Sequence, residues 1–465
     1  MSSSVSIKSV IPTIAGLLIC VISSVGAETK RELPIVGVGK VEGYSYVDST
    51  TMRLMSEAGI NISQCTIDPG TTARSPKGDS ISDYNRFLNF DLTVENARRE
   101  GMQVMMRVWD SSPKNTKETD PTDRKWAGWY QLWTNLVKRY GEDPAIYGWQ
   151  PSDEPPVAKF EILRAAKDTI QKYDPQQRPV YVNMIPFVPN ISRAFGPVEN
   201  CNIKDYDGFI SRFDEVFDPE ILSYDSYGVG KYDGRRYRKS DIYRNLVYYR
   251  RRSEQEGKPF WAYVLGMEVT YPKTATHRHE TGYWTPDAVS MGLEARSALA
   301  FGAQGLVYWT MVQRPDAKNT DGDIVEAYPS APIDLYGNPT PLLDAVREVN
   351  SDIRRYENIF VGGTVKDVVF TKDPAPKEKL GLDLYDPDAG FGPVRSVTSD
   401  GDGLILSRIE NEGRNYLVIV SFDIDRDQQV RLQFDRPMKH LSTNQTTTHT
   451  EITISPGAWG IFSEE

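Results

Sequence analysis

The sequence predicts the α/β fold class: a (β/α)8 TIM barrel over residues 34–357, followed by a C-terminal all-β sandwich domain over residues 360–465. Short β-branched or aromatic runs alternate with stretches of helical period until eight strands are counted, which matches a closed barrel. After about residue 360 the helical period disappears and only short strand-like runs remain. A doubly wound sheet uses the same alternation, but no GxGxxG pattern follows the first strand.

Each barrel strand is predicted from a compact run of β-branched, aromatic or other apolar residues. The runs are residues 35–40, 60–67, 102–109, 146–150, 179–185, 221–227, 260–268 and 305–311. Each helix is predicted from apolar residues that recur three or four positions apart. The helical stretches cover or begin at residues 52–58, 87–97, 129–140, 160–170, 240, 285 and 339–356. Thr285 and Pro286 are predicted as the N-cap and first-turn pair of the helix after the seventh strand.

The tail is predicted to be all-β because none of its apolar runs shows a helical period. Gly, Asp and Asn separate these runs, as expected for turns between strands. The runs are VKDVVF (365–370), GLILSRIE (403–410), NYLVIVSF (415–422), QQVRLQF (428–434) and TEITIS (450–455).

Residues 1–27 have the pattern of a cleavable secretory signal peptide. Lys8 precedes an apolar stretch, and the final Val-Gly-Ala satisfies the small-residue rule for cleavage after Ala27. The alternative is an uncleaved membrane anchor, but the apolar run is shorter than the roughly 20 residues that a span needs, and Pro12 interrupts it. We therefore expect a secreted or periplasmic protein with no integral membrane span in the mature chain.

The composition favours a partner without charge. Lys and Arg total 54 against 64 Asp and Glu, a formal net charge of −10. An acidic surface disfavours nucleic acid and anionic membranes as partners. The 25 Tyr, 16 Phe and 9 Trp supply many rings that can stack on sugar faces. We therefore expect a carbohydrate substrate, while the oligomeric state stays unknown.

Cysteine and histidine are too scarce for a Cys/His metal site. The chain has three Cys, no CxxC pattern and four His. His277 and His279 lie near Glu280, but no strand supplies a further ligand, so we expect a polar loop rather than a metal site. No cofactor is expected. Whether Cys65 and Cys201 form a disulfide stays open.

Chemically useful side chains follow the predicted barrel strands. In such barrels the active site lies at the C-terminal ends of the strands. Two carboxylates that face each other across a cleft lined by Trp and Tyr are what glycoside hydrolysis requires. In strand order, the residues at these ends are Arg107, Trp109, Asp110, Asp153, Glu154, Asn183, Asp225, Tyr227, Glu268 and Trp309.

Glu154 and Glu268 are the predicted catalytic pair. Pro155 and Pro156 keep the chain extended after Glu154, which fixes the direction of this acid. The alternative for Glu154 is a carboxylate that interacts with the N-terminus of the next helix. The alternative for Glu268 is a solvated loop acid. Asp225 is the other possible partner, although a structural hydrogen bond is the simpler reading of that residue.

Seven strand-end residues, Asp225 among them, are predicted to bind substrate, and for Tyr227, Trp309 and Arg107 a structural role is the alternative. Tyr227 would donate to the nucleophile or pack in the core, and Trp309 would form a sugar platform or be buried. Arg107 would bind an acidic sugar or pair with a barrel carboxylate. Asp153, Asn183 and Trp109 complete the set.

Four segments resemble clan A glycoside hydrolases, in particular secreted β-galactosidase-like enzymes whose fourth strand ends in Asp-Glu-Pro. The segments are IYGWQPSDEPP, ILSYDSYG, PFWAYVLGME and AFGAQGLVYWTM, within residues 34–357. The resemblance implies that Glu154 is the acid/base and Glu268 the nucleophile, with Tyr227 supporting Glu268. One departure is Asp153, because the clan usually has an Asn there to donate to the sugar 2-hydroxyl.

These observations lead to one hypothesis and two alternatives. The hypothesis is a secreted glycosidase that cleaves a β-linked oligo- or polysaccharide by a retaining two-carboxylate mechanism. The first alternative is a non-catalytic carbohydrate-binding protein on a glycosidase scaffold. The second is an inverting glycosidase that uses Asp225 or another acid. The sugar and the linkage stay open.

Overall fold

The computed structural model describes residues 32–39, 47–67, 87–108, 120–187, 203, 205–274, 278–378 and 380–464. Residues 32–465 form one compact unit. The predicted signal peptide, residues 1–27, lies outside the described residues, and so does Cys201. None of the described helices combines the length and the apolar character needed to cross a membrane.

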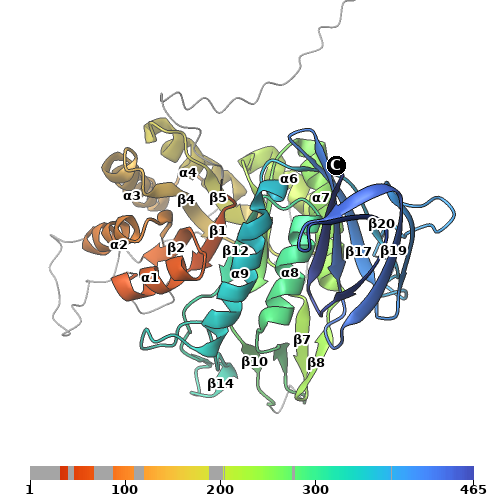
Figure 1. The fold of residues 1–465 in the computed structure, drawn as a ribbon. Helices are drawn as coiled ribbons and strands as arrows, with labels where there is room; N and C mark the ends of the chain where they lie inside the picture. Colours follow the sequence, from red (N-terminus) through yellow and green to blue (C-terminus); the bar gives the residue numbers. More distant parts are fainter. Residues whose placement is uncertain are drawn as a thin grey trace, which may run out of the picture. The chain divides into compact units, whose positions relative to one another are not determined.

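An eight-stranded parallel sheet is the framework of the first part of this unit (Figure 1). The strands follow the order β5-β4-β3-β2-β1-β12-β9-β6, and a parallel bridge between Met184 and Tyr224 closes the sheet into a barrel. This confirms the predicted (β/α)8 barrel. The strands are β1 (Ile35–Val38), β2 (Ile62–Ile67), β3 (Gln103–Val108), β4 (Ile146–Asp153), β5 (Val180–Asn183), β6 (Leu222–Tyr224), β9 (Phe260–Leu265) and β12 (Gly305–Trp309).

The barrel strands are apolar on both faces. Inward-pointing residues form a core of their own that includes Val36, Tyr181, Trp261, Tyr263 and Val307. The outward faces pack on the surrounding helices and belong to the largest core of the molecule. Because both faces are buried, the strands stand out in the sequence as nearly continuous apolar runs.

Helices follow the strands, and most lie where the sequence predicts them. The exception is α6, which the sequence interpretation missed although Asp205 caps it and phenylalanines recur along one buried face. A 3-10 turn, η3 (Val157–Lys159), precedes α4. The helices are α1 (Ser49–Glu57), α2 (Leu88–Arg99), α3 (Arg124–Tyr140), α4 (Phe160–Tyr173), α6 (Tyr206–Phe217), α7 (Asp241–Glu256), α8 (Ala288–Ala300) and α9 (Pro341–Phe360).

Helix α8 differs from its prediction in its start and is unusual in its burial. Its N-cap is Asp287, which accepts a hydrogen bond from the Ser290 backbone N–H at 2.7 Å, so the predicted Thr285 cap is wrong. All residues from Ser290 to Ala300 are buried. The barrel covers one side of the helix and the C-terminal strands cover the other (Figure 1). A helix that is apolar around its circumference is expected in such a position.

The connections after the sixth and seventh barrel strands form a separate antiparallel sheet that the sequence does not predict. Its order is β10-β11-β7-β8, with β7 and β8 after β6 and with β10 and β11 after β9. It therefore belongs to the C-terminal ends of the barrel strands, where active sites form. Its strands are β7 (Val229–Tyr232), β8 (Arg235–Arg238), β10 (Val269–Tyr271) and β11 (Thr281–Tyr283), and a further pair is β13 (Ala317–Lys318) and β14 (Ile324–Glu326).

The C-terminal domain is all-β, as predicted. Its seven antiparallel strands follow the order β15-β17-β18-β21-β19-β16, and β20 pairs with β19. The strands are β15 (Thr364–Phe370), β16 (Val394–Ser399), β17 (Leu404–Asn411), β18 (Arg414–Ser421), β19 (Gln428–His440), β20 (Gln445–Ile454) and β21 (Trp459–Glu464).

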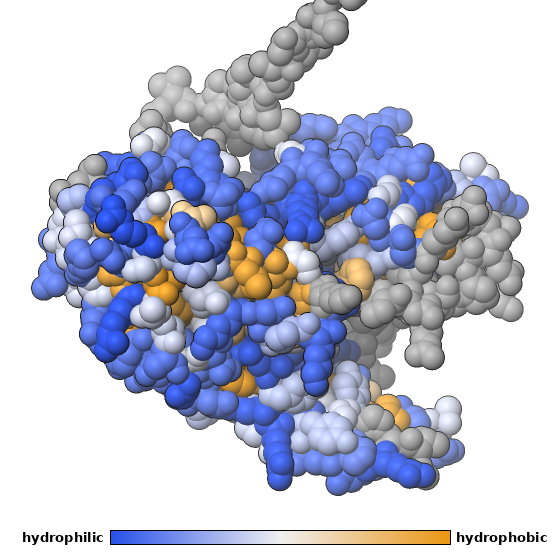
Figure 2. Space-filling view, turned by 90° about the vertical axis from the view of Figure 1, so that its right-hand side faces the viewer, coloured by the Kyte–Doolittle hydropathy of each residue, from blue (hydrophilic) through white to orange (hydrophobic). Residues whose placement is uncertain are grey.

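The alternating residues of β17 and β18 serve two different cores. Ile405 and Val418 join the large core that includes α8 and α9, whereas Leu406 and Leu417 face the domain's own core. The domain is therefore fixed to the barrel through α8 and α9, which lie between the two (Figure 1). The face of the molecule in Figure 2 is mostly hydrophilic, and hydrophobic residues show there only in small patches.

Candidate active site

Four predicted site residues form one hydrogen-bonded group at the barrel mouth. β4 ends with Asp153 and β5 with Asn183, and these residues are register partners. Asn183 Nδ2 donates to Asp153 Oδ1 at 3.3 Å and to Asp225 Oδ1 at 3.0 Å, so the amide bridges two carboxyl groups. Arg107 from β3 forms an ion pair with Asp153 at 3.4 Å. Arg107 therefore pairs with a barrel carboxylate, one of the two roles weighed for it.

Glu154 follows Asp153 directly and has an unusual backbone conformation. Its backbone N–H donates to the Asn183 carbonyl at 2.8 Å, and its φ of 45° lies in the left-handed region. This region costs a non-glycine residue about 1–2 kcal/mol. Two prolines follow and delay the next helix until η3 and α4. Strain of this kind is common where a side chain must point in a functional direction.

Asp225 is a buried carboxyl group of this cluster with a raised pKa. Burial raises the pKa of Asp225 well above its usual range, and the negative charges of Glu154 and Asp153 raise it further. The hydrogen bond from Asn183 opposes these effects without cancelling them. The cluster therefore contains a carboxyl group, Asp225, that favours its protonated form, as a general acid does.

Aromatic rings line the same mouth. The rings of Tyr227 and Trp309 are nearly parallel, with centroids 6.0 Å apart and an interplanar angle of 24°. Tyr283, from β11, meets the ring of Tyr227 edge to face at 5.0 Å. Tyr227 is buried, whereas Trp309 is only partly buried and keeps accessible ring surface. Trp309 is therefore the ring better placed to meet a sugar.

Glu268 lies three residues beyond the end of β9, in a polar network that holds both oxygens of its carboxylate. Lys231 Nζ and Thr270 Oγ1 donate to Oε1 at 3.2 and 3.3 Å. Thr285 Oγ1 donates to Oε2 at 2.6 Å, and Ser330 Oγ lies 3.5 Å from the same oxygen. Hydrogen bonds from both sides fix the orientation of an ionised carboxylate.

Tyr227 is not among the hydrogen-bond partners of Glu268 within the described residues, although the resemblance implies such a contact. The donors found there are Lys231 and Thr285, which the sequence interpretation did not single out as site residues. A signal for Lys231 exists, because Asp233 and Gly234 are a strong hairpin-turn pair. For Thr285, the helix-cap pattern pointed to the wrong function.

A third residue that the sequence does not point to is Glu294, which lies on α8 and is fully buried. Its Oε1 accepts the Gly228 backbone N–H at 2.5 Å, and its Oε2 accepts the Leu265 backbone N–H at 2.7 Å. Gly228 directly follows Tyr227, and Leu265 ends β9. Burial raises the pKa of Glu294 to about 7, although the two backbone hydrogen bonds act to lower it. Glu294 therefore holds together the end of β9 and the connection between β6 and β7.

Trp109, predicted to bind substrate, lies outside the described residues, and so does His277 of the predicted polar loop. His279 pairs with Asp233 at 2.7 Å in the hairpin turn. No three His, Cys, Asp or Glu side chains in the described ranges gather in a way that could hold a metal ion.

No protein-family model matches the chain, and no curated protein matches it. Solved structures do match over most of its length. A β-galactosidase from Bacillus circulans sp. alkalophilus gives a TM-score of 0.57 at 10% identity, covering 93% of this chain and 99% of that one. A catalytic mutant of a family 42 β-galactosidase from G. stearothermophilus gives 0.56 at 10% identity, covering 93% and 98%.

A family 39 glycoside hydrolase from the gut symbiont Bacteroides cellulosilyticus gives a TM-score of 0.51 at 11% identity, covering 94% of this chain and 81% of that one. This chain shares the fold of these glycoside hydrolases. At 10–11% identity this similarity shows the fold alone, a barrel with a β domain. The reaction has to be inferred from the residues of the site.

Proposed function

We propose that this chain is a secreted glycoside hydrolase that cleaves O-glycosidic bonds in a β-linked oligo- or polysaccharide. The observation that carries the proposal is the carboxyl cluster at the barrel mouth, where Asn183 bridges Asp153 and Asp225 and Glu154 follows Asp153 directly. Trp309 offers a ring face beside Tyr227. Paired carboxyl groups and a ring platform are the two requirements of glycoside hydrolysis. The fold shared with two β-galactosidases supports this class.

The principal mechanism is retaining. Glu154 gives its proton to the glycosidic oxygen while an oxygen of Glu268 attacks the anomeric carbon, and the bond to the leaving oxygen breaks. Water then gives a proton to Glu154, and its oxygen displaces Glu268 from the sugar, which restores both side chains. The donors Lys231 and Thr285 support this assignment because they hold Glu268 in one orientation.

A second mechanism is favoured by one specific observation. Burial and the negative charge of Glu154 raise the pKa of Asp225 well above its usual range. In an inverting reaction, protonated Asp225 would give its proton to the leaving oxygen while ionised Glu154 takes a proton from the attacking water. This reaction inverts the configuration at the anomeric carbon in one step, without a covalent intermediate.

The test is hydrolysis of a panel of β-linked oligosaccharides by the wild type and by the variants Glu154→Gln, Glu268→Gln and Asp225→Asn. Glu348→Gln is the matched control, because Glu348 is exposed on α9. Loss of a general acid or base is expected to lower kcat by about 10²–10⁴-fold, so Glu154→Gln should fall in this range. Glu348→Gln should match the wild type.

Proton NMR of the first sugar released separates the two mechanisms. Retained configuration, together with loss of activity in Glu268→Gln, supports the retaining reaction. Inverted configuration, with loss in Asp225→Asn, supports the inverting one. If the wild type hydrolyses none of the panel but still binds oligosaccharides, the hydrolase proposal is wrong and the protein is a carbohydrate-binding scaffold.

A further inference from the structure

The sheet formed by the barrel connections contains a tight hairpin with two cations side by side. Asp233 and Gly234 form the two-residue turn between β7 and β8, with φ values of 44° and 75° that match a type I′ turn. Lys231 on β7 and Arg236 on β8 are directly opposite each other. Like charges in this position destabilise a hairpin. Each cation therefore needs acidic partners, and the two find them in different parts of the molecule.

Lys231 finds its partners at the candidate active site. Its ammonium group lies 3.2 Å from Glu268 Oε1 and 3.0 Å from Glu280 Oε1. Burial acts to lower the pKa of Lys231, but the hydrogen bonds to Glu280 and Glu268 outweigh it, so the pKa is raised and the group stays charged. The side chains of Lys231 and Glu268 are only 16% and 11% exposed, so their attraction is less screened than at the surface.

Arg236 and Arg238 of β8 have partners in the C-terminal domain, and Arg236 has one more at the start of α8, where it lies 3.5 Å from Asp287 Oδ2. Arg236 donates to Asp425 Oδ1 at 2.9 Å and to the Ile424 carbonyl at 2.7 Å. Arg238 donates to Asp402 Oδ2 at 2.9 Å. It also donates to the Phe422 carbonyl at 2.7 Å, and its guanidinium lies 4.8 Å from the centre of the Phe422 ring. These contacts join residues 164–189 positions apart in the sequence.

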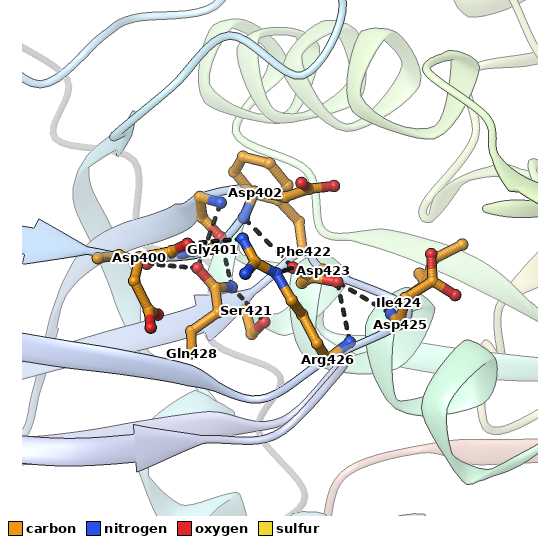
Figure 3. Close-up of polar contacts among 12 residues, drawn as sticks. Asp400, Gly401, Asp402, Ser421, Phe422, Asp423, Ile424, Asp425, Arg426 and Gln428 are labelled. Carbon is orange, nitrogen blue, oxygen red and sulfur yellow. Dashed lines mark hydrogen bonds and ion pairs between the residues drawn. The ribbon is translucent and has the colours of Figure 1, made fainter.

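The acceptors in the C-terminal domain belong to two loops. Hydrogen bonds within the domain hold these loops together without any contribution from the arginines. Asp423, which is 2% exposed, accepts the backbone N–H groups of Asp425 at 2.9 Å and of Asp402 at 3.3 Å. Gln428, the buried first residue of β19, donates to the Gly403 carbonyl and to Ser421 Oγ. Figure 3 shows Gln428 and Ser421 beside Asp402 and Asp423 of these loops. The loops therefore present fixed acceptors to β8.

We propose that Lys231 is a positioning residue for Glu268, and that the C-terminal domain determines where Lys231 lies by binding Arg236 and Arg238 on the adjacent strand. The C-terminal domain then affects the geometry of the active site in addition to the stability of the fold. The inference rests on the proposed function, because it assigns Glu268 a task in hydrolysis. It also goes beyond that function, since it names a long-range determinant of the site.

The test compares the double variant Arg236→Ala/Arg238→Ala with a matched control, Arg431→Ala/Arg436→Ala. The control also removes two arginine charges, but these arginines lie in the C-terminal domain and pair with Glu451 and Asp435. We expect kcat to fall about tenfold in the β8 variant with KM changed less than twofold, because the substrate-binding rings remain. The control variant should keep the wild-type kcat.

A double-mutant cycle tests whether the effect passes through Lys231. In a Lys231→Gln background, Arg236→Ala/Arg238→Ala should cause little additional loss, because the positioned group is already absent. Arg236→Lys/Arg238→Lys keeps the charge but loses the forked hydrogen bonds, so it should recover only part of kcat. If the loss of kcat in the combined variant equals the product of the losses in Lys231→Gln and in the β8 variant, the two act independently and the inference is wrong. An unchanged kcat in the β8 variant would overturn it as well.

Hydrogen exchange provides a measurement that does not depend on activity. Amides of residues 229–232 and 281–283 should exchange faster in the β8 variant than in the control, and the rest of the barrel should be unchanged. If the wild type hydrolyses no glycoside, the proposed function fails, while faster exchange in these strands still supports the coupling to the C-terminal domain. Unchanged exchange contradicts that coupling whatever the activity.

Discussion

Single residues from distant segments organise the barrel mouth. Glu294 is the clearest case, because one carboxyl group accepts backbone hydrogen bonds from the end of β9 and from the connection between β6 and β7. Thr285 is another, because its hydroxyl reaches Glu268 from the segment before α8. Neither residue needs to touch substrate. Both hold groups that the proposed reaction uses.

The raised pKa of Glu294 makes a prediction about stability and pH. Its pKa in the folded protein is about 7, above the ordinary value of 4.5, so the folded state binds this proton more tightly than the unfolded chain does. The contribution of this group to the free energy of unfolding is therefore greatest below pH 4.5. It falls by about 3 kcal/mol between roughly pH 4.5 and 7.

The variant Glu294→Gln has no proton to lose and should lack this dependence. Its amide also places a donor against a backbone N–H, which costs about 1–3 kcal/mol, so it should be less stable than the wild type at low pH. The difference in Tm between the two proteins should shrink as the pH rises from 4.5 to 7. Parallel curves of Tm against pH would contradict the assignment.

Thr285→Val tests the contacts of Glu268 with little change in shape. It removes the donor that lies 2.6 Å from Oε2. A hydrogen bond to a charged group contributes about 1.5–3 kcal/mol, so kcat is expected to fall about tenfold or more on the substrates that the wild type cleaves. Thr398→Val, at an exposed position on β16, is the control and should have no effect. A wild-type kcat in Thr285→Val would argue against Glu268 as the nucleophile.

The residues that meet at the mouth were only partly predictable from the sequence. Asp153 and Asn183 end adjacent strands, so strand order alone brings them together. The sequence identifies Glu268 as a candidate carboxylate but does not predict which side chains contact it. Glu268 lies beyond the end of β9, where strand alternation no longer sets the direction of a side chain. Its partners Lys231 and Ser330 come from connections whose conformation depends on the folded structure.

At the scale of elements, two glycines have opposite effects on stability. A Cβ atom on Gly305, in β12, would lie 2.5 Å from Trp261 Nε1 inside the barrel. A Cβ atom on Gly128, within α3, would meet nothing within 4 Å. Close packing therefore requires the first glycine, whereas the second only weakens its helix.

Gly305→Ala should lower the free energy of unfolding by about 1–3 kcal/mol, because a well-packed barrel cannot easily move Trp261 aside. Gly128→Ala should raise it by about 0.5–1 kcal/mol, because alanine loses less backbone entropy in a helix. Urea denaturation of both variants measures the two changes. A stabilising Gly305→Ala would show that the barrel interior has unfilled space near β12.

The elements that the sequence predicts are those whose burial leaves a pattern. The barrel strands are apolar on both faces and stand out as runs, and most helices show one apolar stripe. The small sheet of β7, β8, β10 and β11 has no such pattern, because Arg235, Tyr237 and Tyr271 are exposed and charges alternate with aromatic rings. Two arginines of β8, Arg236 and Arg238, bind the C-terminal domain, which a run of basic residues does not by itself predict.

At the scale of the whole molecule, the barrel and the C-terminal domain share one core. Ile405 on β17 belongs to the same apolar cluster as α8 and the outer faces of the barrel strands. α8 has no exposed face, so its outer side depends on the C-terminal strands for cover. The two parts are therefore expected to unfold together.

Ile405→Ala tests this joint unfolding. A buried Ile-to-Ala change costs about 2–5 kcal/mol. Every tryptophan except Trp459 precedes residue 357, so tryptophan fluorescence reports mainly on the barrel. We expect the fluorescence midpoint in urea to fall together with the circular-dichroism midpoint. A fluorescence midpoint that stays at the wild-type value would show that the barrel unfolds independently.

The closure of the barrel between β5 and β6 affects how the site can evolve. Within the described residues, one isolated backbone bridge joins these strands. The side chains of Asn183, Ser223 and Asp225 add hydrogen bonds across the same junction. The residues that shape the carboxyl cluster therefore also hold the barrel shut. Mutations that adapt this corner to a new sugar should carry a cost in folding, so new specificities should arise more readily at Trp309 and in the connecting loops.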